Sequence, residues 1–166
     1  MNKIAIAALL SALVAAPAIA ADTYVGVNVG KNQMDFPGVN SSTAIGVLGG
    51  YSFNQNVAAE VAYTNLGSAD TNYPSTITGR VFSIAAVGSL PLNKEFSLLG
   101  KLGVATSTIE ELGNSASKTD LTYGIGAQYN VSKTVGIRLG YDSFKVGSSS
   151  YTKDSALISI GAVFKL

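Results

Sequence analysis

The sequence has no cysteine, histidine or tryptophan among its 166 residues, and only 13% of its residues are charged. Without cysteine there can be no disulfide and no thiol for a lipid anchor. Without histidine or cysteine, the usual serine–histidine and cysteine–histidine nucleophiles and the common zinc sites are excluded. We therefore expect neither enzyme activity nor a cofactor. The 11 basic and 10 acidic residues nearly cancel, so bulk charge does not attract nucleic acid.

Long apolar runs are also missing, except at the N-terminus. There Lys3 precedes an apolar run over residues 4–16, and Ala18-Ile19-Ala20 supplies the small residues of a cleavage site. The run is too short to cross a bilayer as a helix, which needs about 20 residues. We therefore expect residues 1–20 to be a signal peptide that is cleaved before Ala21.

The remaining chain, residues 21–166, is expected to form one domain. In it, apolar and polar residues alternate with a period of two, which predicts strands with one apolar face. The predicted strands are 22–31, 43–53, 57–66, 79–90, 96–108, 119–130, 134–146 and 152–166.

The connections between these segments alternate in length. Three are tight turns, at 54–56, 91–95 and 131–133, whereas 32–42, 67–78, 109–118 and 147–151 are longer and polar. Strands of about 10 residues tilted by about 40° match an outer-membrane apolar band of about 25 Å. The pattern therefore predicts an all-β fold, an eight-stranded antiparallel up-and-down transmembrane β-barrel with a polar interior.

The stretch VGIRLGYD, residues 135–142, shows how the two faces are assigned. Val135, Ile137, Leu139 and Tyr141 have one parity, and Arg138 has the other, together with Asp142 and two glycines. An arginine facing lipid at the bilayer midplane would cost about 2–4 kcal/mol, so Arg138 is predicted to face the lumen. Between the first and last apolar residue of each apolar face, that parity carries no charge in any of the eight segments. The aromatic residues of these faces gather toward the strand ends as two belts. The other parity is small and polar, so we expect a polar, packed lumen.

Charges in such a lumen should be paired, because an unpaired buried charge is costly. The expected pairs are Glu60 with Arg138, Glu60 with Lys101, and Asp142 with either cation. The lumen glycines within 46–50 and 124–126 are expected to leave room for Arg138 and Glu60. Two interpretations remain open: the charges hold the barrel together, or their pairing gates a narrow water path.

Three segments resemble the third, fifth and sixth-to-seventh strands of the OmpA-like transmembrane domain. They are AAEVAYTNLG (58–67), LLGKLG (98–103) and GAQYNVSKTVGIRLGYD (126–142). The resemblance implies an internal charge cluster in which Glu60 and Arg138 match the family's central glutamate and arginine and Lys101 stands at a basic position.

This sequence departs from that family pattern at two positions. Val87 stands where the family tends to carry a lysine, and Gln128 where it tends to carry a glutamate. We define the lumen charge cluster as Glu60, Lys101, Gln128, Arg138 and Asp142. The family often continues into a peptidoglycan-binding domain. Because the sequence stops at the last strand, no such C-terminal domain is expected.

The last strand also resembles an assembly signal. Ser159-x-Gly161-x-x-Phe164-x-Leu166 fits the polar-x-Gly-x-x-apolar-x-apolar pattern read by the outer-membrane barrel assembly machinery. Its terminal leucine differs from the commoner phenylalanine. The machinery is therefore an expected partner.

These observations predict a protein of the bacterial outer membrane with a structural, envelope-integrity and surface-interaction role and four polar extracellular loops. Outer-membrane lipid and lipopolysaccharide are expected partners, as is a host or surface ligand. Arg80 and Lys118 are either contacts for lipid A phosphates or ordinary rim charges. The alternatives are a porin-like small-solute channel with a charged lumen gate, and a soluble lipocalin-type carrier, whose apolar face would lie inside.

Overall fold

The computed structural model describes residues 23–34, 41–70, 76–111, 114–148 and 151–166. The predicted signal peptide lies outside the described residues. Eight strands occur in them: β1 Thr23–Met34, β2 Ser42–Ser52, β3 Val57–Asp70, β4 Thr76–Pro91, β5 Phe96–Glu111, β6 Asn114–Asn130, β7 Val135–Ser148 and β8 Tyr151–Lys165.

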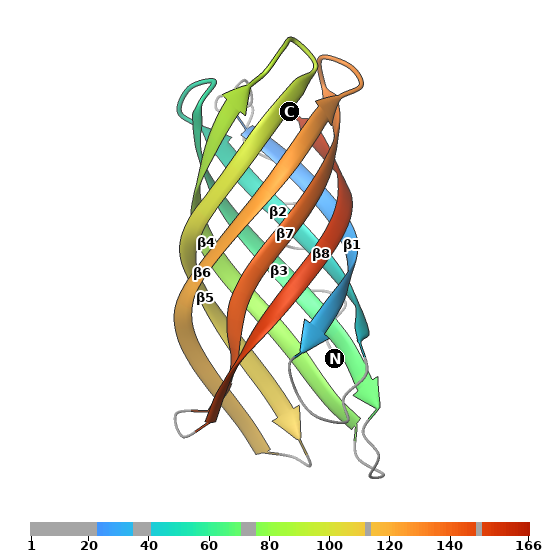
Figure 1. The fold of residues 1–166 in the computed structure, drawn as a ribbon, viewed down its shortest axis with the longest axis vertical. Coiled ribbons are helices and arrows are strands. Elements are labelled where there is room, and N and C mark those ends of the chain that lie inside the picture. Colours follow the sequence, from blue (N-terminus) through green and yellow to red (C-terminus); the bar gives the residue numbers. More distant parts are fainter. Residues whose placement is uncertain (1–22, 35–40, 71–75, 112–113, 149–150) are drawn as a thin grey trace.

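Each strand pairs antiparallel with its neighbour in sequence, and β8 pairs with β1, so the sheet closes into a barrel of tilted strands (Figure 1). The predicted fold class is confirmed. No helix among the described residues is long and apolar enough to cross a membrane.

The three tight turns share one device. Asn54 Oδ1 accepts hydrogen bonds from the backbone N–H groups of Asn56 and Val57, at 2.8 and 2.9 Å. Asn93 and Ser132 accept equivalent bonds in the other two turns. A side-chain acceptor that satisfies two turn N–H groups explains why Asn and Ser occupy these positions.

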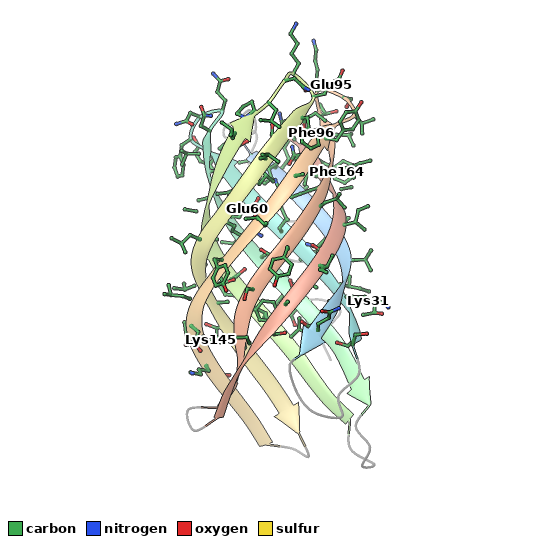
Figure 2. All side chains as sticks on the ribbon, viewed as in Figure 1. Lys31, Glu60, Glu95, Phe96, Lys145 and Phe164 are labelled. Atoms are coloured by element: carbon green, nitrogen blue, oxygen red, sulfur yellow. The ribbon has the colours of Figure 1, made fainter. Side chains whose placement is uncertain are left out.

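The outer face follows the predicted parity. Most of the apolar side chains assigned to lipid are exposed on the barrel, with Leu121 at 68% and Ile125 at 70%. Phe96 and Phe164 lie near the turn end of the wall (Figure 2). Such a surface is stable in hydrocarbon, where its exposure carries no hydrophobic cost.

The strands are longer at the loop end than predicted, so the predicted loop lengths are wrong. β5 continues to Glu111 and β6 begins at Asn114, so most of the predicted loop 109–118 is paired strand. The hydroxyls of Thr106 and Thr119 are hydrogen-bonded across the two strands at 2.8 Å, and a threonine–serine pair follows further along. Polar cross-strand pairs continue the strand pairing beyond the apolar band. In that region apolar residues no longer alternate with polar ones, so the sequence pattern does not show that the strands continue.

The interior is not uniformly polar, which also corrects the sequence-based expectation. One cluster of buried apolar residues, the loop-end apolar layer, comprises Ala44, Leu66, Val81, Ala105, Phe144 and Leu157. A second, the turn-end apolar cluster, comprises Tyr24, Leu48 and Val163 with Ala58 and Ala62 packed against it. The lumen of an eight-stranded barrel is filled by side chains. Where no polar partner is available, an apolar side chain fills it at lower cost.

Candidate functional site

The charged centre of the lumen is built around Glu60, whose side chain is only 2% exposed. Its strand position pairs with Gly50 of β2, which in turn pairs with Tyr24 of β1, so the three residues follow one row of the sheet. The Tyr24 hydroxyl donates a hydrogen bond to Glu60 Oε1 at 2.7 Å, and Arg138 Nη1 donates to the same oxygen. Figure 2 places Glu60 within the barrel.

Arg138 on β7 is held by two further strands. Its Nε and Nη2 atoms donate to Gln128 Oε1 at 3.1 and 3.0 Å, and Gln128 Nε2 donates to Asn130 Oδ1 at 2.8 Å. The guanidinium carbon lies 5.5 Å from the centre of the Tyr24 ring, within cation–π range. A carboxylate, an amide and an aromatic ring therefore surround the charge.

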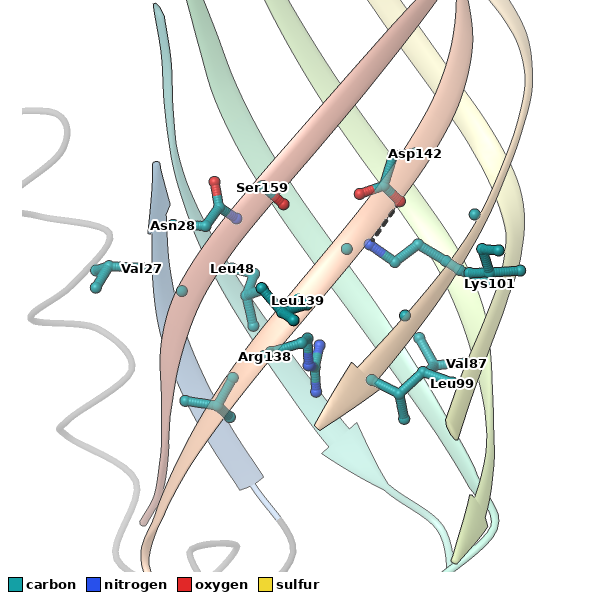
Figure 3. Close-up of a pocket in the computed structure, with 16 residues that line it drawn as sticks. Val27, Asn28, Leu48, Val87, Leu99, Lys101, Arg138, Leu139, Asp142 and Ser159 are labelled. Carbon is teal, nitrogen blue, oxygen red and sulfur yellow. Dashed lines mark ion pairs between the residues drawn. The ribbon is translucent and has the colours of Figure 1, made fainter. Parts of the chain in front are cut away.

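Lys101 on β5 joins the two acidic residues of the cluster. Its Nζ atom is 3.0 Å from Asp142 Oδ1 (Figure 3) and 3.7 Å from Glu60 Oε2. The structure thus brings all five residues of the lumen charge cluster together, and Asp142 is paired with Lys101. Two acids face two bases, so the cluster is formally neutral.

Tyr24 is the member of this site that sequence reasoning missed. Its signal was present, because Tyr24 has the opposite parity to Val25 and Val27 and is therefore an aromatic residue on the lumen face. The structure also corrects the role expected of the glycines. A Cβ at Gly50 would stand 2.1 Å from Tyr24 Cζ, and one at Gly124 would stand 2.5 Å from Asp142 Oδ1. These two glycines make room for Tyr24 and Asp142.

A small cavity adjoins the cluster. Its volume is about 40 Å³, and its polar lining includes Asn28, Lys101, Arg138, Asp142 and Ser159 (Figure 3). A water needs about 10–15 Å³ on this measure, so the cavity has room for a few molecules. Within the described part of the chain, no group of three or more acidic residues is placed to hold a metal ion. The site can order charges and water.

Three residues of the predicted assembly signal, Ser159, Gly161 and Phe164, lie on β8, and Leu166 directly follows it. Ser159 is buried and Phe164 is exposed, and a Cβ at Gly161 would stand 2.4 Å from Val27 O, so β1 approaches closely there. The backbone N–H of Leu166 donates to Thr23 O at 3.0 Å. The signal therefore lies at the seam where the barrel closes, and its recognition stays a prediction.

The two candidate rim cations differ in placement. Arg80 is half-buried. Lys118 Nζ lies 3.2 Å from Asp120 Oδ2 and shares its face with the buried Thr122. Lys118 is thus directed to the lumen side of the wall, and contact with lipid A phosphates stays a prediction for both residues.

Comparison with known proteins supports the architecture. The sequence model described as an outer membrane protein beta-barrel domain matches residues 5–164. No curated protein matches the sequence.

Several solved structures share the fold at low sequence identity. Neisserial surface protein A (NspA) is 16% identical with a TM-score of 0.59, over 87% of this chain and 96% of that one. Ail, the attachment invasion locus protein of Yersinia pestis, is 19% identical with a TM-score of 0.52, over 86% and 97%. OprG from Pseudomonas aeruginosa is 14% identical with a TM-score of 0.58, over 88% and 97%.

Proposed function

The chain belongs to the outer membrane protein β-barrel domain family, and from this premise we propose that it is a structural barrel of the bacterial outer membrane. In this role the barrel is closed to solutes, stabilises the envelope and carries polar hairpins at the cell surface. The observation that carries the proposal is the filled lumen.

Buried side chains of the described residues occupy the lumen at several levels. Near the tight turns, Tyr24, Leu48 and Val163 pack together beside Arg138 and Gln128. Toward the loops, the loop-end apolar layer lies beyond the charge cluster. The cavity beside the charge cluster has room for only a few water molecules. This packing supports a structural role over a channel.

The loop end supports a role in surface contact. The β5–β6 hairpin extends to Glu111 and Asn114, beyond the apolar band, and its described outer positions carry hydroxyl side chains. NspA is named as a surface protein and Ail as an attachment invasion locus protein, and both have this fold. We extend to this chain a role in contacting lipopolysaccharide or a surface ligand through its hairpins.

The closed-barrel proposal is tested by conductance. Purified protein is reconstituted in a planar bilayer at a known density, with a porin as positive control. The native protein should show no discrete openings. Reproducible openings in native protein would refute the proposal and favour the small-solute channel with a charged lumen gate.

Orientation and surface exposure need a separate test. A protease site is inserted at residues 149–150, between β7 and β8, and intact cells are treated with the protease. Cleavage in intact cells is expected if the loop end is outside. Cleavage only after lysis would refute a surface role for these hairpins.

A further inference from the structure

The loop-end apolar layer crosses the lumen as a nearly complete ring. Its six residues come from β2, β3, β4, β5, β7 and β8, and none is more than 5% exposed. The layer therefore joins opposite walls of the barrel. Its largest members are Leu66, Phe144 and Leu157.

This layer lies on the loop side of the central Glu60–Arg138 pair, and Asp142, at the loop-side edge of the charge cluster, precedes Phe144 by two positions on β7. Leu66 follows Glu60 by six positions on β3, and Phe144 follows Arg138 by six positions on β7, both toward the loops. Six residues span roughly 20 Å of strand, or roughly 15 Å along the axis of a barrel whose strands tilt by about 40°. A solute crossing the lumen would meet the charge cluster and the apolar layer in series.

A β-bulge fixes Leu66 in the layer. The register of β3 against β4 shifts between Asn65 and Ser68, and Gly67 has φ +75°. The Ser42 hydroxyl donates to Leu66 O at 2.6 Å, and the Gly67 N–H donates to Asn65 Oδ1 at 2.9 Å. The Leu66 side chain is 0% exposed. The bulge re-aims the strand locally while its polar groups remain satisfied.

Hydroxyl groups near this level of the lumen are bound to the backbone of β7. Ser107 Oγ donates to Lys145 O at 3.0 Å, and Thr122 Oγ1 donates to Ser143 O at 2.9 Å. These hydroxyls are therefore committed to protein acceptors.

The two strands absent from the layer bring polar side chains beside it. Asn32 of β1 pairs in register with Leu157 and accepts a hydrogen bond from the Ser155 hydroxyl at 2.7 Å, and Asp120 of β6 pairs in register with Ala105 and lies 3.2 Å from Lys118 Nζ.

We propose that the loop-end apolar layer is the permeability barrier of this barrel, and that the lumen charge cluster is a structural brace behind it. The inference rests on the proposed function, since it assumes that the native lumen is closed. Apolar constrictions exclude water and ions by dewetting. Breaking the ion pairs leaves such a constriction intact, whereas making it polar removes the barrier.

The test compares two kinds of change in the same lumen. The layer variant carries Leu66→Asn and Leu157→Asn, which keep side-chain size close to that of leucine but add polar groups. The cluster variant carries Glu60→Gln and Arg138→Met, which remove the central ion pair. Leu48→Asn is the matched control, because Leu48 is also a buried lumen leucine but lies outside the layer.

Potassium efflux from proteoliposomes and planar-bilayer conductance are measured for each protein. Folding is checked by circular dichroism and by gel mobility without heating. The layer variant should raise efflux at least about tenfold over native protein, equivalent to a barrier lower by about 1.4 kcal/mol. The cluster variant and Leu48→Asn should match native protein.

Each outcome has a distinct meaning. Efflux from the cluster variant, with a folded layer variant as tight as native, would place the barrier at the ion pairs and overturn this inference. Efflux from native protein would refute the closed-barrel function itself. If the double layer variant does not fold, Phe144→Gln is used under the same criteria.

Discussion

Replacing Arg138 with methionine removes the guanidinium that donates to Glu60 and Gln128 while keeping an unbranched side chain. Glu60 would then be a carboxylate with 2% exposure, supported only by the Tyr24 hydroxyl and by Lys101 Nζ at 3.7 Å. Removing one partner of a buried ion pair costs about 3–5 kcal/mol. Because Lys101 remains, we expect a loss at the lower end, about 3 kcal/mol.

Adding Glu60→Gln should recover much of this loss. The neutral amide no longer requires a cation, and its oxygen can still accept the hydrogen bond from Tyr24. Replacing both members of a buried pair is often close to neutral. We therefore expect Arg138→Met with Glu60→Gln to be at least about 2 kcal/mol more stable than Arg138→Met alone.

The free energy of unfolding is measured by guanidinium titration in detergent micelles. The chain has no tryptophan, so circular dichroism of the sheet replaces tryptophan fluorescence. The titration must be reversible, because only then does the linear extrapolation give a free energy. If the free energy of unfolding of Arg138→Met with Glu60→Gln is equal to or lower than that of Arg138→Met alone, the ion pair is not the dominant interaction of Glu60.

Three further changes test individual contacts by the same unfolding titration. Gly67→Ala should cost at least about 1–3 kcal/mol because its φ is +75° and the new Cβ would meet a backbone oxygen at 2.3 Å, whereas Gly100→Ala, whose Cβ meets nothing within 4 Å, should be neutral. Equal effects of the two would contradict the bulge. Tyr24→Phe should cost about 1.5–3 kcal/mol by removing a bond to a buried carboxylate, whereas Tyr129→Phe loses only an exposed 3.4 Å contact. Lys101→Met should cost less than Arg138→Met, since its ammonium is 22% exposed, and the reverse order would refute this ranking.

The sequence predicted the faces of the barrel well because a period of two leaves only two choices for each strand. One choice would have placed the charged side chains of Arg138 and Glu60 in hydrocarbon. The free-energy cost of that placement is large, so it determined which face of each strand points to the lumen. The pairing of Glu60 with both cations followed from the same reasoning, because the four charges of the cluster share one narrow section of the lumen and have few other partners within reach.

The strand ends, the loop-end apolar layer and the role of Tyr24 could not be predicted from the alternation of apolar and polar residues. The strands outside the apolar band continue as polar ladders, and no apolar periodicity marks where they end. The loop-end apolar layer combines residues from six strands, so it becomes visible only when the register is known. Tyr24 was overlooked because one aromatic residue in a predicted lumen does not report its partner across the barrel.

The lumen charge cluster and the loop-end apolar layer have different physical roles in the lumen. The outer wall faces lipid, so the hydrophobic effect gives the interior of this barrel no general preference for apolar side chains. Polar side chains are acceptable there when each finds a partner, and they fix which strands lie opposite one another, as Glu60, Gln128 and Arg138 do on β3, β6 and β7. A network that binds polar groups so well also attracts water. An apolar layer in series with the network prevents that water from forming a path, which is why the same lumen contains both.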